Sequence, residues 1–327
     1  MKRTAASILL AAAALAAAGQ RRASAKVRTV TIPYTDGTAV MEGYVAYDDA
    51  LRGRRPGVIV FPEWWGPNDY AKRRARQLAS LGYVALVADV YGKGVRPRTT
   101  EAAARLAAAY KKDRALLRRR AAAALRALKG QHLVDAGKVA AVGYCFGGTC
   151  ALELARSGAD VKAVVSFHGG LSTTRPARPG QVRAKVLVLH GADDPFVPPA
   201  EVAAFQREMR AARADWQMHS YGGAVHSFTN PAAGRDPSRG AAYNKRAAER
   251  SWAAMKVSLA EAIGLPRWDG DSGGGAGAFL QDKVARPVGK AGVATGKAVG
   301  KAGVATGKAV KRAATWVWDK LKGNEGN

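Results

Sequence analysis

Residues 143–147 read GYCFG and place one cysteine, Cys145, between two glycines. An apolar run at 138–142 precedes this segment and a helix-like run at 148–155 follows it, so the thiol stands on a strand–turn–helix. The flanking glycines lack the Cβ atoms that would clash in a strained turn, and a helix that begins beside a thiol favours its thiolate. The pattern predicts a nucleophilic cysteine at the tip of a sharp turn. A buried cysteine in an ordinary tight turn is the alternative.

A nucleophilic thiol needs a general base, for which the downstream histidines are the candidates. His226 lies in a glycine-rich loop, 222–228, that follows the last predicted strand. Loops beyond the ends of strands often carry catalytic residues, so His226 is the predicted base. The remaining downstream histidines lie within or at the ends of predicted strands, where we expect structural roles: His168, His190 and His219.

The base in turn needs a carboxylate that orients it, and two aspartates are suitably placed. Asp193 and Asp194 come directly after a predicted strand, in the segment LHGADDPFVP at 189–198. A histidine base can use either of them, because both follow the same strand end. Their spacing therefore leaves both open as the orienting acid.

An acyl-transfer site also needs two backbone N–H groups to hold the oxyanion. Phe146 would supply one of them, and the loop at 61–66 (FPEWWG) would supply the other. Trp64 and Trp65 stand beside an acid in this loop, which is not ordinary turn composition. We expect these indoles to line a substrate pocket, the alternative being that they only cap the sheet.

Strand and helix patterns alternate along the chain, which predicts a mainly parallel sheet with helices on both faces. Strands are predicted at 27–32, 39–47, 57–61, 83–87, 138–142, 161–167, 185–189 and 216–221. Helices are predicted at 70–81, 100–129 (one helix or two), 201–212 and 244–263, besides the one after Cys145. About eight strands with the nucleophile on an inner one suit the α/β-hydrolase fold, within the α/β class.

The N-terminus predicts export. Residues 1–25 combine a basic start, a short apolar run and small residues suited to cleavage, as in a secretory signal peptide. An uncleaved anchor is the alternative. We therefore expect a periplasmic or secreted protein in which residues 26–265 form the catalytic domain. The chain's two cysteines, Cys145 and Cys150, lie five residues apart across the turn and its helix, a geometry in which we expect no mutual disulfide.

Residues 266–327 differ in composition from the rest of the chain. A glycine-rich linker leads to two identical eleven-residue repeats, 289–299 and 300–310, whose lysines would fall on one helical stripe. Trp316 and Trp318 follow, and the pattern predicts binding to an anionic membrane or envelope surface, with a solvated tail as the alternative. The net charge of +27 also suits nucleic acid, but no binding motif accompanies it, so we do not expect that partner.

Five segments, in this order, are similar to the dienelactone hydrolase family of α/β-hydrolases. They are 62–66 (PEWWG), 88–92 (ADVYG), 143–148 (GYCFGG), 191–198 (GADDPFVP) and 226–228 (HSF). The resemblance implies a Cys-His-Asp triad at Cys145, His226 and Asp194. It selects Asp194 over Asp193 because Asp194 holds the family's spacing to the Val-Pro pair at 197–198.

The resemblance further implies that Glu63 contacts the resting thiol and helps to activate it, and that the N–H of Trp64 completes the oxyanion hole. The chain departs from the family at Asn230, where the founding members carry an arginine that binds the carboxylate of dienelactone. This departure argues against dienelactone itself as the substrate. We expect the substrate pocket to be lined by Trp65, Tyr144 and Asn230.

Together these features predict an exported hydrolase that cleaves an ester or lactone bond of a small molecule through a covalent acyl-thioester intermediate. Two alternatives stay open: an acyl thioesterase using the same site, and an exported surface-binding protein with a vestigial hydrolase core. We expect no cofactor and no metal, because the sequence has neither an H-E-x-x-H nor a Walker pattern.

Overall fold

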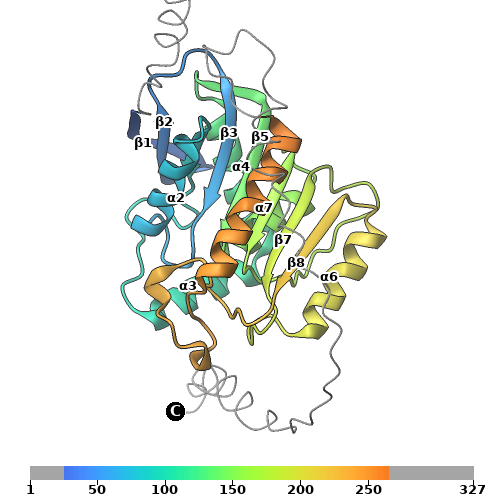
Figure 1. The fold of residues 1–327 in the computed structure, drawn as a ribbon. Coiled ribbons are helices and arrows are strands. Elements are labelled where there is room, and N and C mark those ends of the chain that lie inside the picture. The colour runs from blue at the N-terminus through green and yellow to red at the C-terminus, as the bar shows by residue number, and fades with distance from the viewer. Residues whose placement is uncertain (1–25, 265–327) are drawn as a thin grey trace, which may run out of the picture.

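The computed structural model of the chain describes residues 26–264 (Figure 1). The predicted signal peptide, the end of the predicted catalytic domain at residue 265 and the basic tail lie outside the described residues. None of the helices within 26–264 has the length and apolar content that crossing a membrane requires.

Within the described residues, eight strands form one sheet in the order β1-β2-β4-β3-β5-β6-β7-β8. β1 pairs antiparallel with β2, β2 pairs antiparallel with β4, and the other neighbours are parallel. The strands are β1 (Val27–Asp36), β2 (Ala39–Asp48), β3 (Arg55–Phe61), β4 (Val84–Val87), β5 (Val134–Tyr144), β6 (Ala163–Phe167), β7 (Lys185–Gly191) and β8 (Trp216–Tyr221). The predicted mainly parallel sheet, with the cysteine after an inner strand, is confirmed.

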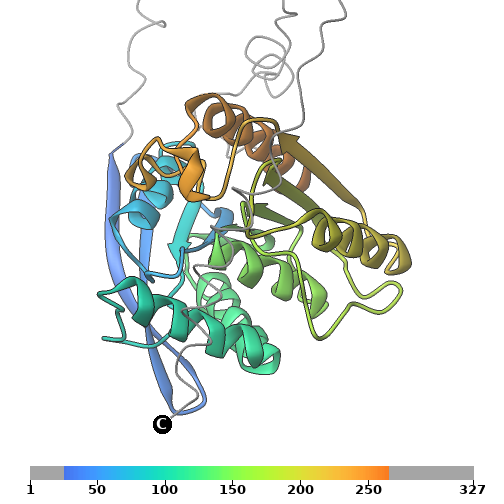
Figure 2. The same cartoon turned by 90° about the horizontal axis from the view of Figure 1, so that it is seen from below.

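Helices cover both faces of this sheet, as Figure 2 shows from below. They are α2 (Asp69–Ala79), α3 (Thr100–Lys112), α4 (Arg114–Lys129), α5 (Phe146–Arg156), α6 (Pro199–Ala211) and α7 (Lys245–Ile263), with short 3-10 turns η1 (Pro231–Ala233) and η2 (Pro237–Arg239). The side chains of α2 and α7 pack in one apolar cluster, and those of α3 to α6 pack in a second cluster on the other face. Alternate residues of the strands contribute to the two clusters, as the pleat of a strand requires.

Local sequence explains where the helices begin. Asn68, Thr99 and Asn244 each accept a hydrogen bond from a backbone N–H in the first turn of α2, α3 and α7. Asp113 does the same for α4, and it divides the predicted helical segment at 100–129 into two helices. These side chains satisfy donors that would otherwise lack a partner at a helix start.

Two glycines allow α5 to start in close contact with β3 and β5. A Cβ atom built on Gly143 would lie 1.9 Å from the carbonyl oxygen of Gly147, and one built on Gly147 would lie 2.1 Å from that of Phe61. Both neighbours are backbone atoms that cannot turn aside. The packing thus requires glycine at both positions, as the sequence pattern predicted.

Gly147→Ala should therefore lower the free energy of unfolding by about 3 kcal/mol or more, because the backbone of β3 or α5 must move to admit one methyl group. Urea denaturation of the full chain would measure the loss. Gly222→Ala is a matched control, since a Cβ atom there meets nothing within 4 Å. A loss at Gly147 no larger than at Gly222 would contradict the packing argument.

Candidate active site

Cys145 occupies the turn between β5 and α5. Its backbone has φ 53° and ψ −117°, a strained conformation for a residue with a side chain. Its N–H donates to the carbonyl oxygen of Phe167 at 3.0 Å and to Nδ1 of His168 at 3.2 Å, so the end of β6 holds the turn in place. The side chain is half-buried, which leaves the thiol within reach of a small molecule.

The structure brings Cys145, His226 and Asp194 into one line of contacts. Nε2 of His226 lies 3.0 Å from Sγ of Cys145, and Nδ1 lies 2.8 Å from Oδ2 of Asp194. The three residues follow the carboxyl ends of β5, β8 and β7, which meet at one edge of a parallel sheet. A thiol, an imidazole and a carboxylate in this order can move a proton between the sulfur and the ring.

The two neighbouring aspartates have different surroundings. The side chain of Asp194 is fully buried, and its second oxygen, Oδ1, accepts a hydrogen bond from the N–H of Phe196 at 2.9 Å. Asp193 is exposed, and its carboxylate accepts from the N–H of Gly223 at 3.1 Å. The carboxylate that contacts His226 is therefore the one that the family resemblance selected.

The loop that carries His226 is held by backbone hydrogen bonds. The N–H of His226 donates to the carbonyl oxygen of Gly240 at 3.1 Å, and its own carbonyl accepts from Ala242 at 3.0 Å. Ser227 adopts a positive φ of 54°, which turns the chain sharply after the histidine. The ring of Phe196, itself an exposed aromatic side chain, contacts His226 edge-on with centroids 5.4 Å apart.

Charge in the site favours a protonated His226. Burial by itself lowers the pKa of this imidazole, but the Cys145 sulfur and the Asp194 carboxylate outweigh burial and hold the pKa well above its ordinary value of 6.5. The arrangement stabilises an imidazolium between two groups that can each be negative. This is the charge state that a cysteine–histidine nucleophile uses.

A second imidazole lies beside the first and stays neutral. His168 is completely buried at the end of β6, with its ring 5.3 Å from that of His226. Burial and the neighbouring His226 charge lower its pKa well below 6.5. Nδ1 accepts from the Cys145 N–H, so Nε2 carries the proton and donates to Oγ1 of Thr229 at 2.7 Å. The structural role expected for His168 thus includes contact with the backbone of Cys145.

The other two histidines downstream of Cys145 have structural positions on strands. His190 is buried near the end of β7, and burial lowers its pKa. His219 is exposed on β8.

Glu63 and Asn230 form a buried pair. Nδ2 of Asn230 donates to Oε2 of Glu63 at 2.8 Å, and Oδ1 of Asn230 accepts from the N–H of Ala232 at 3.0 Å. Burial raises the pKa of Glu63, while the hydrogen bond from Asn230 and the His226 charge oppose the rise. The Glu63 carboxylate thus interacts with Asn230 and Ser227 rather than with the thiol. Both polar groups of the Asn230 amide are therefore hydrogen-bonded within the protein, and the residue is buried.

The loop after β3 supplies the other expected groups. Trp64 and Trp65 are half-buried, with their rings edge-to-face at 5.7 Å. Within residues 26–264, the N–H groups of Trp64 and Phe146 have no hydrogen-bond acceptor, which leaves both free for an oxyanion.

Tyr144 does not reach the open site. Its side chain is completely buried on the α2 and α7 side of the sheet and stacks on Phe167 with centroids 4.6 Å apart. Neighbouring residues of a strand point to opposite faces, so the residue before the nucleophile is directed into the core. The prediction that Tyr144 lines the substrate pocket is wrong.

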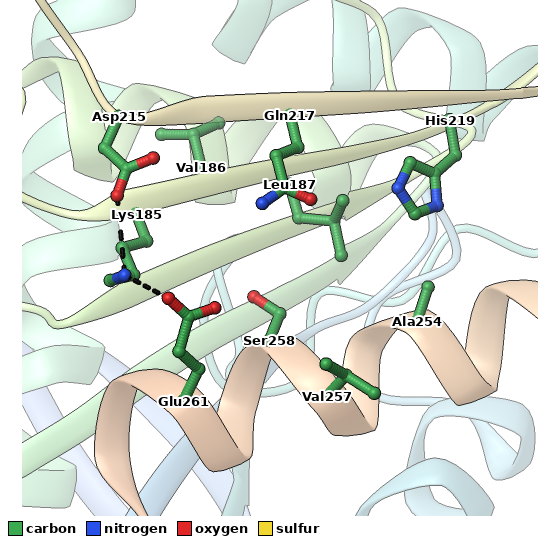
Figure 3. A pocket seen from close by; sticks show the side chains of 10 residues that line it. All are labelled: Lys185, Val186, Leu187, Asp215, Gln217, His219, Ala254, Val257, Ser258 and Glu261. Carbon is green, nitrogen blue, oxygen red and sulfur yellow. Dashed lines mark hydrogen bonds and ion pairs between the residues drawn. The ribbon is translucent and has the colours of Figure 1, made fainter. Parts of the chain in front are cut away.

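A separate hollow of about 210 Å³ lies between β7, β8 and α7 (Figure 3). Lys185 there contacts both Asp215 and Glu261, so its charge is already paired. The lining of this hollow includes none of Cys145, His226 and Asp194, so it is distinct from the contact line described above. In the described part of the chain, no group of three His, Cys, Asp or Glu side chains is placed to hold a metal ion.

The strand order and the cysteine on a strand–turn–helix, facing a histidine and an aspartate from later strands, define an α/β-hydrolase. A sequence model of the Dienelactone hydrolase family matches residues 41–263. The chain belongs to that family.

Several known proteins and solved structures are similar to this chain. A “Probable 2-oxo-3-(5-oxofuran-2-ylidene)propanoate lactonase” of Bradyrhizobium is 31% identical over 236 residues, which cover 68% of this chain and 92% of that protein. An uncharacterized protein of Caenorhabditis elegans is 43% identical over 151 residues, or 45% of this chain and 94% of that one. The crystal structure of a dienelactone hydrolase-like promiscuous phosphotriesterase from metagenomic libraries is 45% identical, with a TM-score of 0.67 over 73% of this chain and 99% of that chain.

Proposed function

We propose that the chain hydrolyses carboxylic esters or lactones, with Cys145 as the nucleophile and an acyl thioester as the intermediate. The observation that carries this proposal is the contact line from Cys145 through His226 to Asp194, at 3.0 Å and 2.8 Å. Membership of the dienelactone hydrolase family and the lactonase name of the Bradyrhizobium relative support it.

In the first half of the reaction, the Cys145 sulfur attacks the substrate carbonyl carbon while His226 holds the thiol proton. The carbonyl oxygen becomes an oxyanion, which the N–H groups of Phe146 and Trp64 stabilise by about 3 kcal/mol each. Collapse of the tetrahedral intermediate breaks the bond to the alkoxy oxygen. His226 gives that oxygen its proton, and the acyl group stays on sulfur.

In the second half, neutral His226 takes a proton from a water molecule that attacks the thioester carbonyl. Asp194 keeps the ring oriented and stabilises the imidazolium that forms. The same two N–H groups hold the second oxyanion. The acid product leaves, and the sulfur and the imidazole return to their starting state.

The proposal is tested by trapping the acyl enzyme. Mixing the full chain with excess p-nitrophenyl acetate should give a burst of nitrophenol, of about one equivalent per chain, before the steady rate. Mass spectrometry of the quenched protein should then find the acetyl group on the peptide that holds Cys145. Steady turnover with the acetyl group on another residue, or on none, would overturn the assignment.

Glu63 remains the predicted thiol-activating acid, and its contact with Asn230 makes the role testable. Glu63→Gln keeps an oxygen for the Asn230 amide but removes the carboxylate charge. We expect about a tenfold lower kcat/KM and a similar fall in the rate at which iodoacetamide alkylates Cys145. Because burial raises the pKa of Glu63, the charged fraction of its carboxylate in the wild type grows as the pH rises. The difference in these rates between the wild type and Glu63→Gln should therefore widen with rising pH. Unchanged rates across pH would remove Glu63 from the activation step.

Acyl thioesters are the nearest alternative substrates, because they would pass through the same intermediate. A panel of esters, lactones and thioesters with one shared acyl group separates the two: a higher kcat/KM for the thioester at equal acyl chemistry would favour the thioesterase.

A second candidate activity is hydrolysis of phosphotriesters. It is favoured by the 45% identity to the promiscuous phosphotriesterase over nearly the whole of that chain. Paraoxon turnover that disappears together with ester turnover in Cys145→Ala would support a shared site. Paraoxon turnover that survives the substitution would point to another site.

Export and surface binding stay proposals for the two ends of the chain. Residues 1–25 would direct export, and residues 266–327 would bind an anionic envelope surface, while residues 26–265 carry the catalysis. Deletion of 266–327 should leave ester turnover intact and abolish sedimentation with anionic vesicles. Absence of ester turnover in the full chain, together with vesicle binding that is lost on deletion of 266–327, would favour the surface-binding alternative.

A further inference from the structure

Tyr91 belongs to the ADVYG segment at 88–92, which the proposed reaction leaves without a role. The segment follows β4, next to the loop that holds Trp64. The backbone of Tyr91 is fixed on both sides: its N–H donates to Oδ1 of Asp89 at 3.1 Å, and its carbonyl accepts from the hydroxyl of Tyr110 at 3.1 Å. The residue is buried, and burial raises the pKa of its phenol, which therefore stays a protonated donor.

The side chain of Tyr91 contacts both residues whose N–H groups would hold the oxyanion. Its hydroxyl donates to the carbonyl oxygen of Trp64 at 3.0 Å. Its ring stacks on that of Phe146, with centroids 5.5 Å apart and planes 20° apart. Trp64 lies in the loop after β3 and Phe146 begins α5, so one side chain links two donors that are far apart in the sequence.

This link matters because an oxyanion hole stabilises the developing charge only when its N–H groups point at the oxygen. The N–H of Trp64 shares a planar peptide group with the Glu63 carbonyl, which accepts from the Gly66 N–H at 3.0 Å. The Tyr91 hydroxyl holds the peptide group on the other side of the Trp64 Cα atom, so the two contacts together limit the tilt of the N–H. A displacement of about 1 Å in a positioned group can lower a rate by about a hundredfold. Asp89 is itself fully buried and accepts hydrogen bonds from Glu42, Gly92 and Arg96. These contacts hold the segment that carries Tyr91 in place.

We infer that Tyr91 is a positioning residue that aligns the Trp64 and Phe146 N–H groups for the oxyanion. The inference rests on the proposed function, since it assigns to that same site a residue that supports the two donors. Tyr91 touches no reacting atom, so its effect must pass through the two donors.

The test compares a reaction that forms an oxyanion with one that does not. Tyr91→Phe removes one oxygen and keeps the stacking ring. In the full chain we expect kcat for p-nitrophenyl acetate to fall about tenfold with KM within about twofold. Alkylation of Cys145 by iodoacetamide should keep its wild-type rate, because sulfur attack on that reagent creates no oxyanion. A trifluoromethyl ketone, which binds the thiol as an oxyanion adduct, should bind about tenfold more weakly.

Tyr83→Phe is the matched control. Its hydroxyl donates to the carbonyl oxygen of Gly264, and the residue precedes β4, at the opposite end from Tyr91. We expect unchanged kcat, alkylation and ketone binding. Wild-type kcat and ketone affinity in Tyr91→Phe would overturn the inference, and so would equal losses of turnover and alkylation, which indicate general damage. If Cys145 carries no acyl group in the burst experiment, the proposed function fails whatever Tyr91→Phe does.

Discussion

Cys145→Ala should lower kcat for p-nitrophenyl acetate by about 10⁴-fold or more. The substitution removes the sulfur that forms the acyl enzyme, and no neighbouring side chain can replace it: His226 then faces a methyl group, and His168 is buried and neutral. The burst of nitrophenol should disappear together with the steady rate. Release of nitrophenol at both rates would be measured by stopped-flow absorbance.

The chain offers a matched control in its other cysteine. Cys150 is completely buried in α5, and burial raises the pKa of its thiol, so it is an inert core residue. Cys150→Ala should keep kcat within about threefold and lose at most about 1 kcal/mol of stability. Activity that survives Cys145→Ala and disappears in Cys150→Ala would show that Cys150 is the nucleophile. That result would refute the proposed mechanism.

Asp194→Asn should give the next largest effect, a fall in kcat of about 10³- to 10⁴-fold. The amide cannot balance the charge of the His226 imidazolium, and its NH₂ group can turn toward Nδ1 and impose the wrong tautomer. The pKa of His226 should drop from well above 6.5 toward or below it, because Asp194 is one of the two groups that raise it. NMR titration of His226 ring resonances would measure that drop.

The raised pKa of His226 also makes the stability of the fold depend on pH. His226 has a higher pKa in the folded state than in the unfolded chain, so its contribution to stability is fully present below about pH 6.5 and declines as the pH rises through the raised value. In Asp194→Asn this decline should begin at lower pH. Asp193→Asn is the control, because that exposed carboxylate bonds to the N–H of Gly223 and not to His226. Equal losses from Asp193→Asn and Asp194→Asn would contradict the assignment of the acid.

Much of the fold could be predicted because each segment's pattern is local. Continuous apolar runs such as 57–61 became buried parallel strands, and Asn244 began the last helix where the sequence indicated. The contact of Cys145, His226 and Asp194 could be predicted because each residue follows a strand end, and parallel strands bring those ends together. The choice of Asp194 needed the spacing to Val197, since local composition treats the two aspartates alike.

The rest could not be predicted because it depends on contacts between distant segments. Asn230 binds Glu63 across 167 positions, and Tyr91 reaches Trp64 from another strand, and no periodicity encodes either contact. Tyr144 was misplaced for a related reason: the motif gives its position in the chain, while the pleat of β5 decides which face it joins. A hydroxyl or amide residue beside a motif indicates that a polar contact forms there, but the sequence does not show which residue is the partner.

The strained backbone around the thiol has a thermodynamic consequence for the whole molecule. Cys145, His168 and Ser227 all hold positive φ without being glycine, at 53°, 40° and 54°. Each such residue costs about 1–3 kcal/mol, so three of the residues around the thiol reduce the stability of the fold. Selection for stability alone would replace these residues with glycine and lose the thiol, the imidazole and the turn that presents the base. Thermal robustness and turnover therefore compete at these positions, and stabilising substitutions are best sought in the apolar clusters away from them.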